Sequence, residues 1–208
     1  MPFINFRETY VQFGKSHYEE NNIIMHMICT PLILWGVIGF ASLTGPLVPT
    51  PDWLAPFIQF SPEGTFDLSL GAFIMLFYFL YSLALDFIYA FLFFPILICI
   101  LTTTHYLIQT TPDAPHYFYL AFICGAFLNH VGHYFIEKRR PRVYEGDFFT
   151  VFFAYFYVTY TFLMHLGYRT EFYQELRQEI NQSIQSSSSS KPDPATPSHP
   201  SKTTTPKN

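Results

Sequence analysis

The stretch IIMHMICTPLILWGVIGFASL, residues 23–43, determines the predicted fold class. It contains no Asp, Glu, Lys or Arg over its whole length. A helix of roughly 20 mainly apolar residues is long enough to cross a hydrocarbon core about 30 Å thick. The stretch therefore predicts a transmembrane helix, with His26 in its first turn and next to one membrane surface.

The composition of the whole chain is typical of a membrane protein. Of the 208 residues, 50% are hydrophobic, 20% are aromatic and only 12% are charged, whereas about 25% of the residues are charged in a typical soluble domain. No Lys or Arg occurs between Lys15 and Lys138. The chain is therefore expected to sit in a lipid bilayer and not to bind nucleic acid.

Further apolar runs follow toward the C-terminus. Residues 69–108 are too many for one pass, so two spans are predicted there, with Asp86 and Pro95 marking the turn because proline disrupts a helix interior. Residues 117–136 form a fourth predicted span, and residues 148–167 form a fifth apolar run that either spans or is re-entrant. The predicted fold is an all-α polytopic bundle of four to five spans.

The two ends of the chain are polar. The N-terminal segment lacks the pattern of a cleaved signal peptide and is predicted to lie at the membrane interface. Residues 171–185 have the pattern of a polar surface helix. The Ser-, Thr- and Pro-rich residues 183–208 cannot bury a core and are predicted to be a disordered tail. The expected domains are thus a membrane-embedded unit, 1–182, and this tail.

Charge asymmetry predicts the topology. The sequence KRRPR, residues 138–142, belongs on the cytosolic side, as do Arg7 and Lys15, whereas the acidic, cation-free loop 44–67 belongs on the opposite side. Three passes between that loop and Lys138 satisfy both assignments. The three cysteines, which have neither CxxC spacing nor a common loop, are expected to be buried free thiols: Cys29, Cys99 and Cys124.

A group of histidines is expected at the cytosolic membrane boundary. His26 begins the first span, and His130 and His133 end the fourth, followed by Glu137. At about 100° per residue, His133 and Glu137 share one helix face and His130 nearly does. His17 can join this group, because Asn21 or Asn22 is a suitable N-cap that would separate it from the helix.

Neutral imidazoles with a carboxylate suit a divalent transition metal. Such a set with open positions is typical of non-haem Fe(II) oxygen chemistry, and zinc fits the same ligand types. Three other classes stay open: a non-catalytic scaffold with hydrogen-bonded histidines, a haem protein with a histidine pair, and a transporter using Asp86. The remaining histidines are interpreted as hydrogen-bonded or solvated side chains, namely His105, His116, His165 and His199.

Two segments resemble the motifs of a known family. HYEENNIIMHMICTPLIL fits H-x4-N-x3-H through His17, Asn22 and His26. FLNHVGHYFIEKRRP fits a second motif through Gly132, His133, Glu137, Lys138, Arg139 and Pro141. Together, and in this order, they resemble the endoplasmic-reticulum 2-hydroxy fatty acid dioxygenases of phytosphingosine breakdown.

The resemblance implies Fe(II)-dependent α-oxidation, in which a long-chain 2-hydroxy fatty acid and O2 give a fatty acid one carbon shorter. It also implies an endoplasmic-reticulum membrane location with a cytosolic active site. The implied iron ligands are His17, His26 and His133, with His130 as an additional candidate. Glu137 is carried over among the catalytic residues, as a metal ligand, a partner of a ligand or a structural ion pair. The expected substrate contacts are Asn22, Lys138, Arg139 and Arg140.

Overall fold

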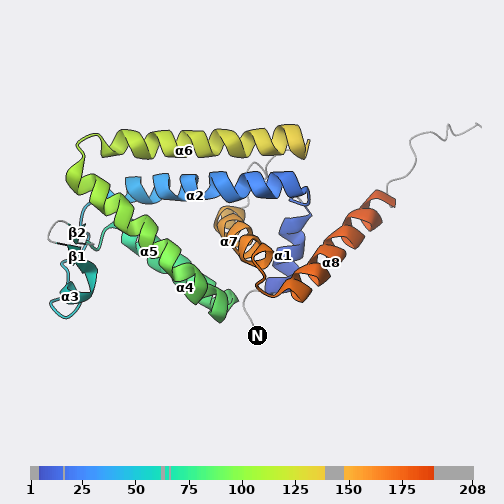
Figure 1. The fold of residues 1–208 in the computed structure, drawn as a ribbon, viewed down its shortest axis with the longest axis horizontal. Coiled ribbons are helices and arrows are strands. Elements are labelled where there is room, and N and C mark those ends of the chain that lie inside the picture. Colours follow the sequence, from blue (N-terminus) through green and yellow to red (C-terminus); the bar gives the residue numbers. More distant parts are fainter. Residues whose placement is uncertain (1–4, 16, 62–63, 66, 139–147, 190–208) are drawn as a thin grey trace, which may run out of the picture.

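The computed structural model describes residues 5–15, 17–61, 64–65, 67–138 and 148–189. Its apolar helices confirm the predicted helical membrane architecture (Figure 1). The main elements are α1 (Phe6–Gly14), α2 (Glu20–Ser42), α4 (Leu70–Leu85), α5 (Phe87–Thr110), α6 (Ala114–Val131), its continuation η1 (Gly132–Ile136), α7 (Phe148–His165) and α8 (Thr170–Ser189). A short helix, α3 (Ala55–Ile58), and a hairpin of β1 (Gln59–Ser61) and β2 (Gly64–Thr65) occupy the loop between α2 and α4.

Among the described residues, three helices are long and apolar enough to cross a membrane. They are α2, α5 and the continuous helix Ala114–Ile136. Helix α4 is also apolar but has only 16 residues, which rise about 24 Å. The first, third and fourth predicted spans are therefore present at full length, and the second is shorter.

Helices α2 and α6 lie side by side and antiparallel (Figure 1). Glycines allow the two backbones to approach closely: a Cβ on Gly36 would lie 2.7 Å from the Phe118 carbonyl oxygen, and one on Gly125 would lie 2.9 Å from the Cys29 carbonyl oxygen. Small residues serve this purpose widely between membrane helices. The antiparallel packing brings the start of α2 next to the end of α6.

The corner between α4 and α5 is at Asp86, as predicted. Its carboxylate caps α5 by accepting a hydrogen bond from the Tyr89 backbone N–H at 3.0 Å. The second predicted turn marker is wrong, because Pro95 lies inside α5. Membrane helices tolerate an interior proline, since neighbouring groups and small local adjustments satisfy the freed carbonyl.

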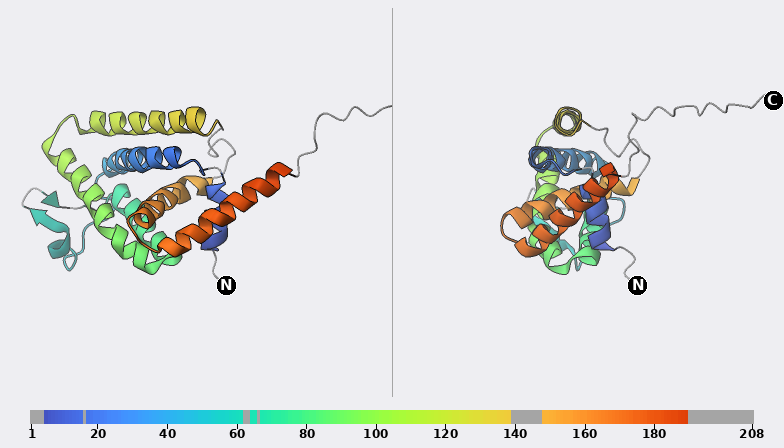
Figure 2. Two further views of the ribbon diagram at one scale, coloured as in Figure 1. Left: turned by 45° about the vertical axis from the view of Figure 1, so that its right-hand side comes forward. Right: turned by 90° about the vertical axis from the view of Figure 1, so that its right-hand side faces the viewer.

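Helix α7, the fifth apolar run, lies across the long helices. In the view down the long axis α6 is seen end-on, whereas α7 extends across the molecule (Figure 2). From Phe153 to Thr161 its side chains are buried, apart from the partly buried Ala154. The helix therefore forms the aromatic core between α1, α4, α5 and α8, and it does not run parallel to the three long helices.

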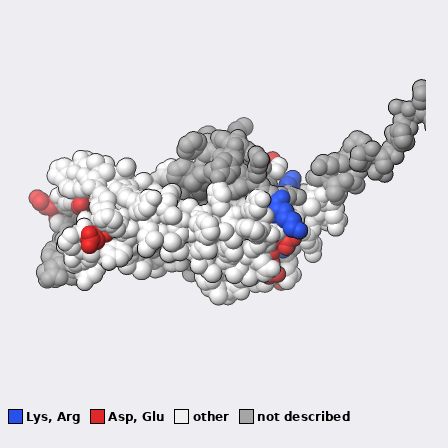
Figure 3. Space-filling view, turned by 90° about the horizontal axis from the view of Figure 1, so that it is seen from above, with Lys and Arg blue, Asp and Glu red and all other residues white. Residues whose placement is uncertain are grey.

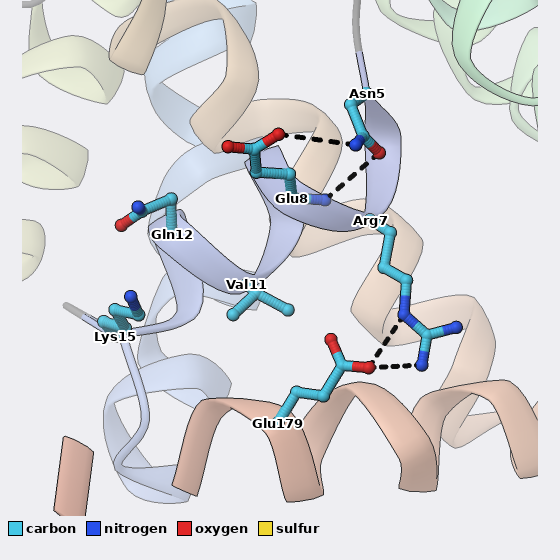
Figure 4. A pocket seen from close by; sticks show the side chains of 7 residues that line it. All are labelled: Asn5, Arg7, Glu8, Val11, Gln12, Lys15 and Glu179. Atoms are coloured by element: carbon cyan, nitrogen blue, oxygen red, sulfur yellow. Dashed lines mark hydrogen bonds and ion pairs between the residues drawn. The ribbon is translucent and has the colours of Figure 1, made fainter. Parts of the chain in front are cut away.

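Helix α8 returns to the N-terminal helix and confirms the predicted C-terminal surface helix. Arg7 Nε donates to Glu179 Oε1 at 2.8 Å (Figure 4). Arg7 Nη2 also lies 3.2 Å from Glu175 Oε2. A Cβ on Gly14 would collide with Ile180. Helix α8 extends to Ser189, beyond the predicted domain boundary at 182–183. The rest of the predicted tail, residues 190–208, lies outside the described residues.

The charges gather at the two ends of the long axis. Acidic side chains lie at both ends, some at the end that carries the α2–α4 loop and others beside the described Lys and Arg toward the end that carries α1 and α8. A broad uncharged surface lies between the two ends (Figure 3). Cys29 is buried as predicted, but Cys99 and Cys124 are exposed on the outer faces of α5 and α6. An apolar run does not distinguish a side chain that faces protein from one that faces lipid.

Candidate metal centre

Three histidines from separate parts of the chain meet in a buried cluster. His17 lies between α1 and α2, His26 in α2 and His133 in η1, and one ligand atom from each lies within 4.8 Å of the others. The ring centroids are 4.8 to 5.1 Å apart. The structure thus brings together the three histidines on which the sequence motifs depend.

The local backbone explains how His17 faces the other two rings. Helix α2 begins at Glu20, with Glu19 as its N-cap residue. The predicted caps, Asn21 and Asn22, therefore lie inside the helix. His17 therefore precedes the helix and is not held to the angular spacing that an unbroken helix would impose.

A π-helical turn positions His133. At η1 the Glu137 N–H donates to the Gly132 carbonyl at 3.3 Å, an i to i+5 hydrogen bond. Single π turns inside α-helices frequently occur at functional sites. His133 and Glu137 are buried here, whereas His130 is exposed and lies outside the cluster. The structure does not bring His130 into the three-histidine group, and its role as a metal ligand stays a prediction.

His17 is held by α1, the helix that precedes it. Its ring stacks on Phe13, with centroids 4.2 Å apart and planes 6° apart. Its Nδ1 lies 3.2 Å from the Phe13 carbonyl oxygen, so that nitrogen carries the proton and donates. This leaves the lone pair on Nε2, the arrangement by which a backbone carbonyl commonly orients a metal-binding histidine.

The other two histidines have comparable local partners. His26 Nδ1 lies 3.7 Å from Cys29 Sγ, and His133 Nδ1 lies 3.5 Å from Glu137 Oε2. Each Nδ1 therefore faces a nearby group from its own stretch of chain. The Glu137 carboxylate lies beside His133 and is not itself a member of the three-histidine group.

Unsatisfied polar groups surround the histidines. Within the described residues, the Asn22 amide, His26 Nε2 and both Glu137 carboxylate oxygens are buried and form no hydrogen bond. Each such group costs about 1–3 kcal/mol, and native proteins satisfy nearly all of them. Their concentration at one place, together with one ligand nitrogen from each of three histidines, fits a site that binds a metal ion and a polar ligand.

Gly132 allows this part of the site to form. A Cβ at this position would collide with Asn22 Oδ1 and lie 3.2 Å from Met25 Sδ. The π turn and the first turn of α2 can approach each other only because position 132 carries no side chain. The sequence motif includes this glycine, but the spacing of the motif does not explain why a glycine is needed there.

The remaining predicted site residues lie at the edge of the cluster or away from it. Lys138 is exposed and follows the π turn with φ of 54°, and Arg139 and Arg140 lie outside the described residues. His105 Nε2 lies 2.7 Å from Asp67 at the opposite end of the molecule. His116, which is exposed, lies at that end too. His165 Nδ1 contacts the Thr161 carbonyl at 2.8 Å. His199 lies outside the described residues.

Asp86, the residue that suggested a transporter, has structural partners. Its carboxylate accepts hydrogen bonds from Tyr160 at 2.9 Å and Tyr168 at 3.1 Å, and it forms an ion pair with Arg169 at 3.1 Å. Together with the cap on Tyr89, these contacts fix the α4–α5 corner to the α7–α8 corner. The sequence contained no signal for this network, because its members are far apart in the chain.

A comparison with protein families now identifies the chain. A family model described as 2-hydroxy-palmitic acid dioxygenase Mpo1-like matches residues 3–166. The chain belongs to the Mpo1-like family. The match confirms the resemblance noted in the sequence and includes all three clustered histidines, but it ends before α8. No curated protein and no solved structure matches the chain.

Proposed function

We propose that this Mpo1-like protein is an Fe(II)-dependent dioxygenase that shortens long-chain 2-hydroxy fatty acids by one carbon. The observation that carries the proposal is the buried group of His17, His26 and His133, whose ligand atoms lie within 4.8 Å of one another. The family description, 2-hydroxy-palmitic acid dioxygenase, supports the substrate class.

One ring nitrogen from each of the three histidines would hold the metal. Three neutral imidazoles accept either zinc or iron, and the oxygen chemistry of the family favours iron. Bound Fe(II) would supply open coordination positions for O2 and for the hydroxyl and carboxylate of the substrate. One 2-hydroxy acid and one O2 balance to one shorter acid, CO2 and water, so the substrate supplies the electrons and no separate reductant is needed.

The surrounding residues would bind and orient. Glu137, whose Oε2 lies 3.5 Å from His133 Nδ1, would orient the His133 ring. The unsatisfied Asn22 amide offers one donor group and one acceptor to the polar head of the substrate. Lys138, with Arg139 and Arg140, would attract the carboxylate from the aqueous side.

The position of the cluster suits a membrane-soluble substrate. It lies at the start of α2 and the end of α6, two helices that are long and apolar enough to cross a membrane. An acyl chain can therefore remain in the bilayer while its head reaches the histidines. The charge distribution supports a cytosolic orientation of this end, and we place the protein in the endoplasmic-reticulum membrane, as the family resemblance implies.

Metal content and single-turnover activity test the proposal. The full chain is purified anaerobically in detergent, iron per chain is quantified, and 2-hydroxypalmitate and O2 are added. We expect about one iron per chain and a product one carbon shorter, with both lost in His26→Ala and His133→Ala. His116→Ala, an exposed histidine at the opposite end, is the matched control.

A non-catalytic scaffold predicts a different result. Folded protein that holds no metal, and that forms no product after Fe(II) is added back, would reject the dioxygenase and favour the scaffold. A haem protein would be recognised at once by its visible absorbance.

A further inference from the structure

The segment that carries His17 is held from outside the α2–α6 pair. Tyr157 of α7 donates its hydroxyl hydrogen to the His17 carbonyl at 3.2 Å, and Arg177 of α8 donates from Nη1 to the next carbonyl, that of Tyr18, at 3.0 Å. Two consecutive carbonyls of the α1–α2 connection are thus fixed by side chains from two different helices.

His17 needs this support more than the other two histidines. His26 and His133 are parts of helices whose backbones pack closely at Gly36, Gly125 and Gly132. His17 lies between helices, so its position depends on how the α1–α2 connection is anchored. Its stacking on Phe13 fixes the ring to α1 but does not fix α1 to α2.

Helix α1 is itself docked on α7 and α8. Tyr10 donates to Thr161 Oγ1 at 2.5 Å, since the Thr161 hydroxyl already donates to the Tyr157 carbonyl at 2.6 Å. Burial raises the pKa of Tyr10, so its hydroxyl keeps the proton for this bond. On the α8 side, Leu176 and Ile180 are fully buried. Helix α8 is therefore firmly placed and can act as a fixed support.

We propose that Arg177 is a positioning residue of the metal centre, and that α8 supports His17 although it lies outside the family match at residues 3–166. The inference rests on the proposed metal-binding function. Arginine suits this task because its planar guanidinium offers several donors in a fixed arrangement. Loss of groups that orient metal ligands typically weakens metal binding 10- to 100-fold. Since Arg177 acts through the backbone next to His17, we expect about a tenfold loss.

The test measures metal affinity and ligand geometry in the full chain. Co(II) is titrated anaerobically into the metal-free protein in detergent, and its visible spectrum reports both the Kd and the ligand set. Arg177→Gln should bind about tenfold more weakly with an altered spectrum, and Arg177→Lys, which keeps a cationic donor, should recover part of the loss. Arg7→Gln is the matched control, because Arg7 also joins α1 to α8 but contacts Glu175 and Glu179 on the surface instead of the connection.

Each outcome separates the two proposals. If the wild-type chain binds neither Co(II) nor Fe(II), the proposed function itself fails. If it binds metal and Arg177→Gln binds equally well, or if Arg7→Gln weakens binding as much, the role of Arg177 is overturned and the metal centre stands. Should Arg177→Gln fail to fold, Tyr157→Phe decides the anchoring by α7, and Arg177→Met, which keeps the aliphatic stem without the donors, decides that by α8. Unchanged affinity and spectrum in both would overturn the anchoring of this connection.

Discussion

The rings of His26 and His133 lie 4.8 Å apart although they come from the start of one long helix and the end of another. Antiparallel packing of α2 and α6 produces this contact, and His133 lies within the π turn η1. The proximity of these rings therefore depends on helix register, which can be tested by substitution.

Two histidines three residues apart should behave differently. His133→Ala should abolish metal binding, because it removes one of three buried ligand atoms. His130→Ala should leave iron per chain unchanged, because His130 is exposed. Metal analysis of both purified variants checks this. Loss of iron from His130→Ala would show that His130 is a ligand in the metal-bound protein.

Glu137→Gln tests whether the acid orients His133 or ligates the metal itself. The amide keeps the size of the side chain but removes the negative charge 3.5 Å from His133 Nδ1. As an orienting residue, Glu137 should give a 10- to 100-fold weaker metal affinity when replaced, roughly the range seen for such partners. Complete loss of metal, equal to that of His133→Ala, would instead identify Glu137 as a ligand.

Gly132→Ala should displace Asn22. The added Cβ collides with Asn22 Oδ1, and overpacking of this kind costs about 1–3 kcal/mol, partly offset by the helical preference of alanine over glycine, about 1 kcal/mol. Turnover should fall as the amide moves. The double variant Asn22→Ala/Gly132→Ala is the control, since removal of the amide makes room for the methyl group. If the loss in free energy of unfolding of the double variant equals the sum of the losses of the two single variants, the collision is not with Asn22.

Asn22→Leu should raise stability and lower activity. The Asn22 amide is buried without hydrogen bonds in the described structure, and replacing such a group by an apolar one of similar shape removes a penalty of about 1–3 kcal/mol. Thermal unfolding of the metal-free protein and single-turnover rates measure the two effects. A destabilised variant with unchanged turnover would mean that Asn22 supports the fold and not the substrate.

Asp86→Ala should destabilise the protein without removing the metal. It takes away the α5 N-cap, which is worth about 1 kcal/mol, and leaves Tyr160 and Tyr168 without their acceptor. The total loss should be about 2–4 kcal/mol. Arg169→Gln should cost less, because the Arg169 side chain is 45% exposed and its ion pair is screened by solvent. An ion leak abolished by Asp86→Ala in proteoliposomes would revive the transporter.

The sequence by itself determined the membrane class, the long helices, the break at Asp86 and the histidines that meet. Apolar length is a property of consecutive residues, so residues 23–43 and 117–136 were enough to predict α2 and the helix that ends in η1. The two histidine motifs carried the family because their residues are close together in the chain.

Only the tertiary structure decided which neighbours of those motifs belong to the site. His130 and His133 nearly share one α-helical face, and only the packing of the helices shows that His133 is buried and His130 exposed. The crosswise course of α7, the hydrogen bonds of Asp86 and the contact of Arg177 with the Tyr18 carbonyl join residues distant in sequence. Such contacts depend on how helices pack against one another, a relationship in space that local spacing along the chain does not contain.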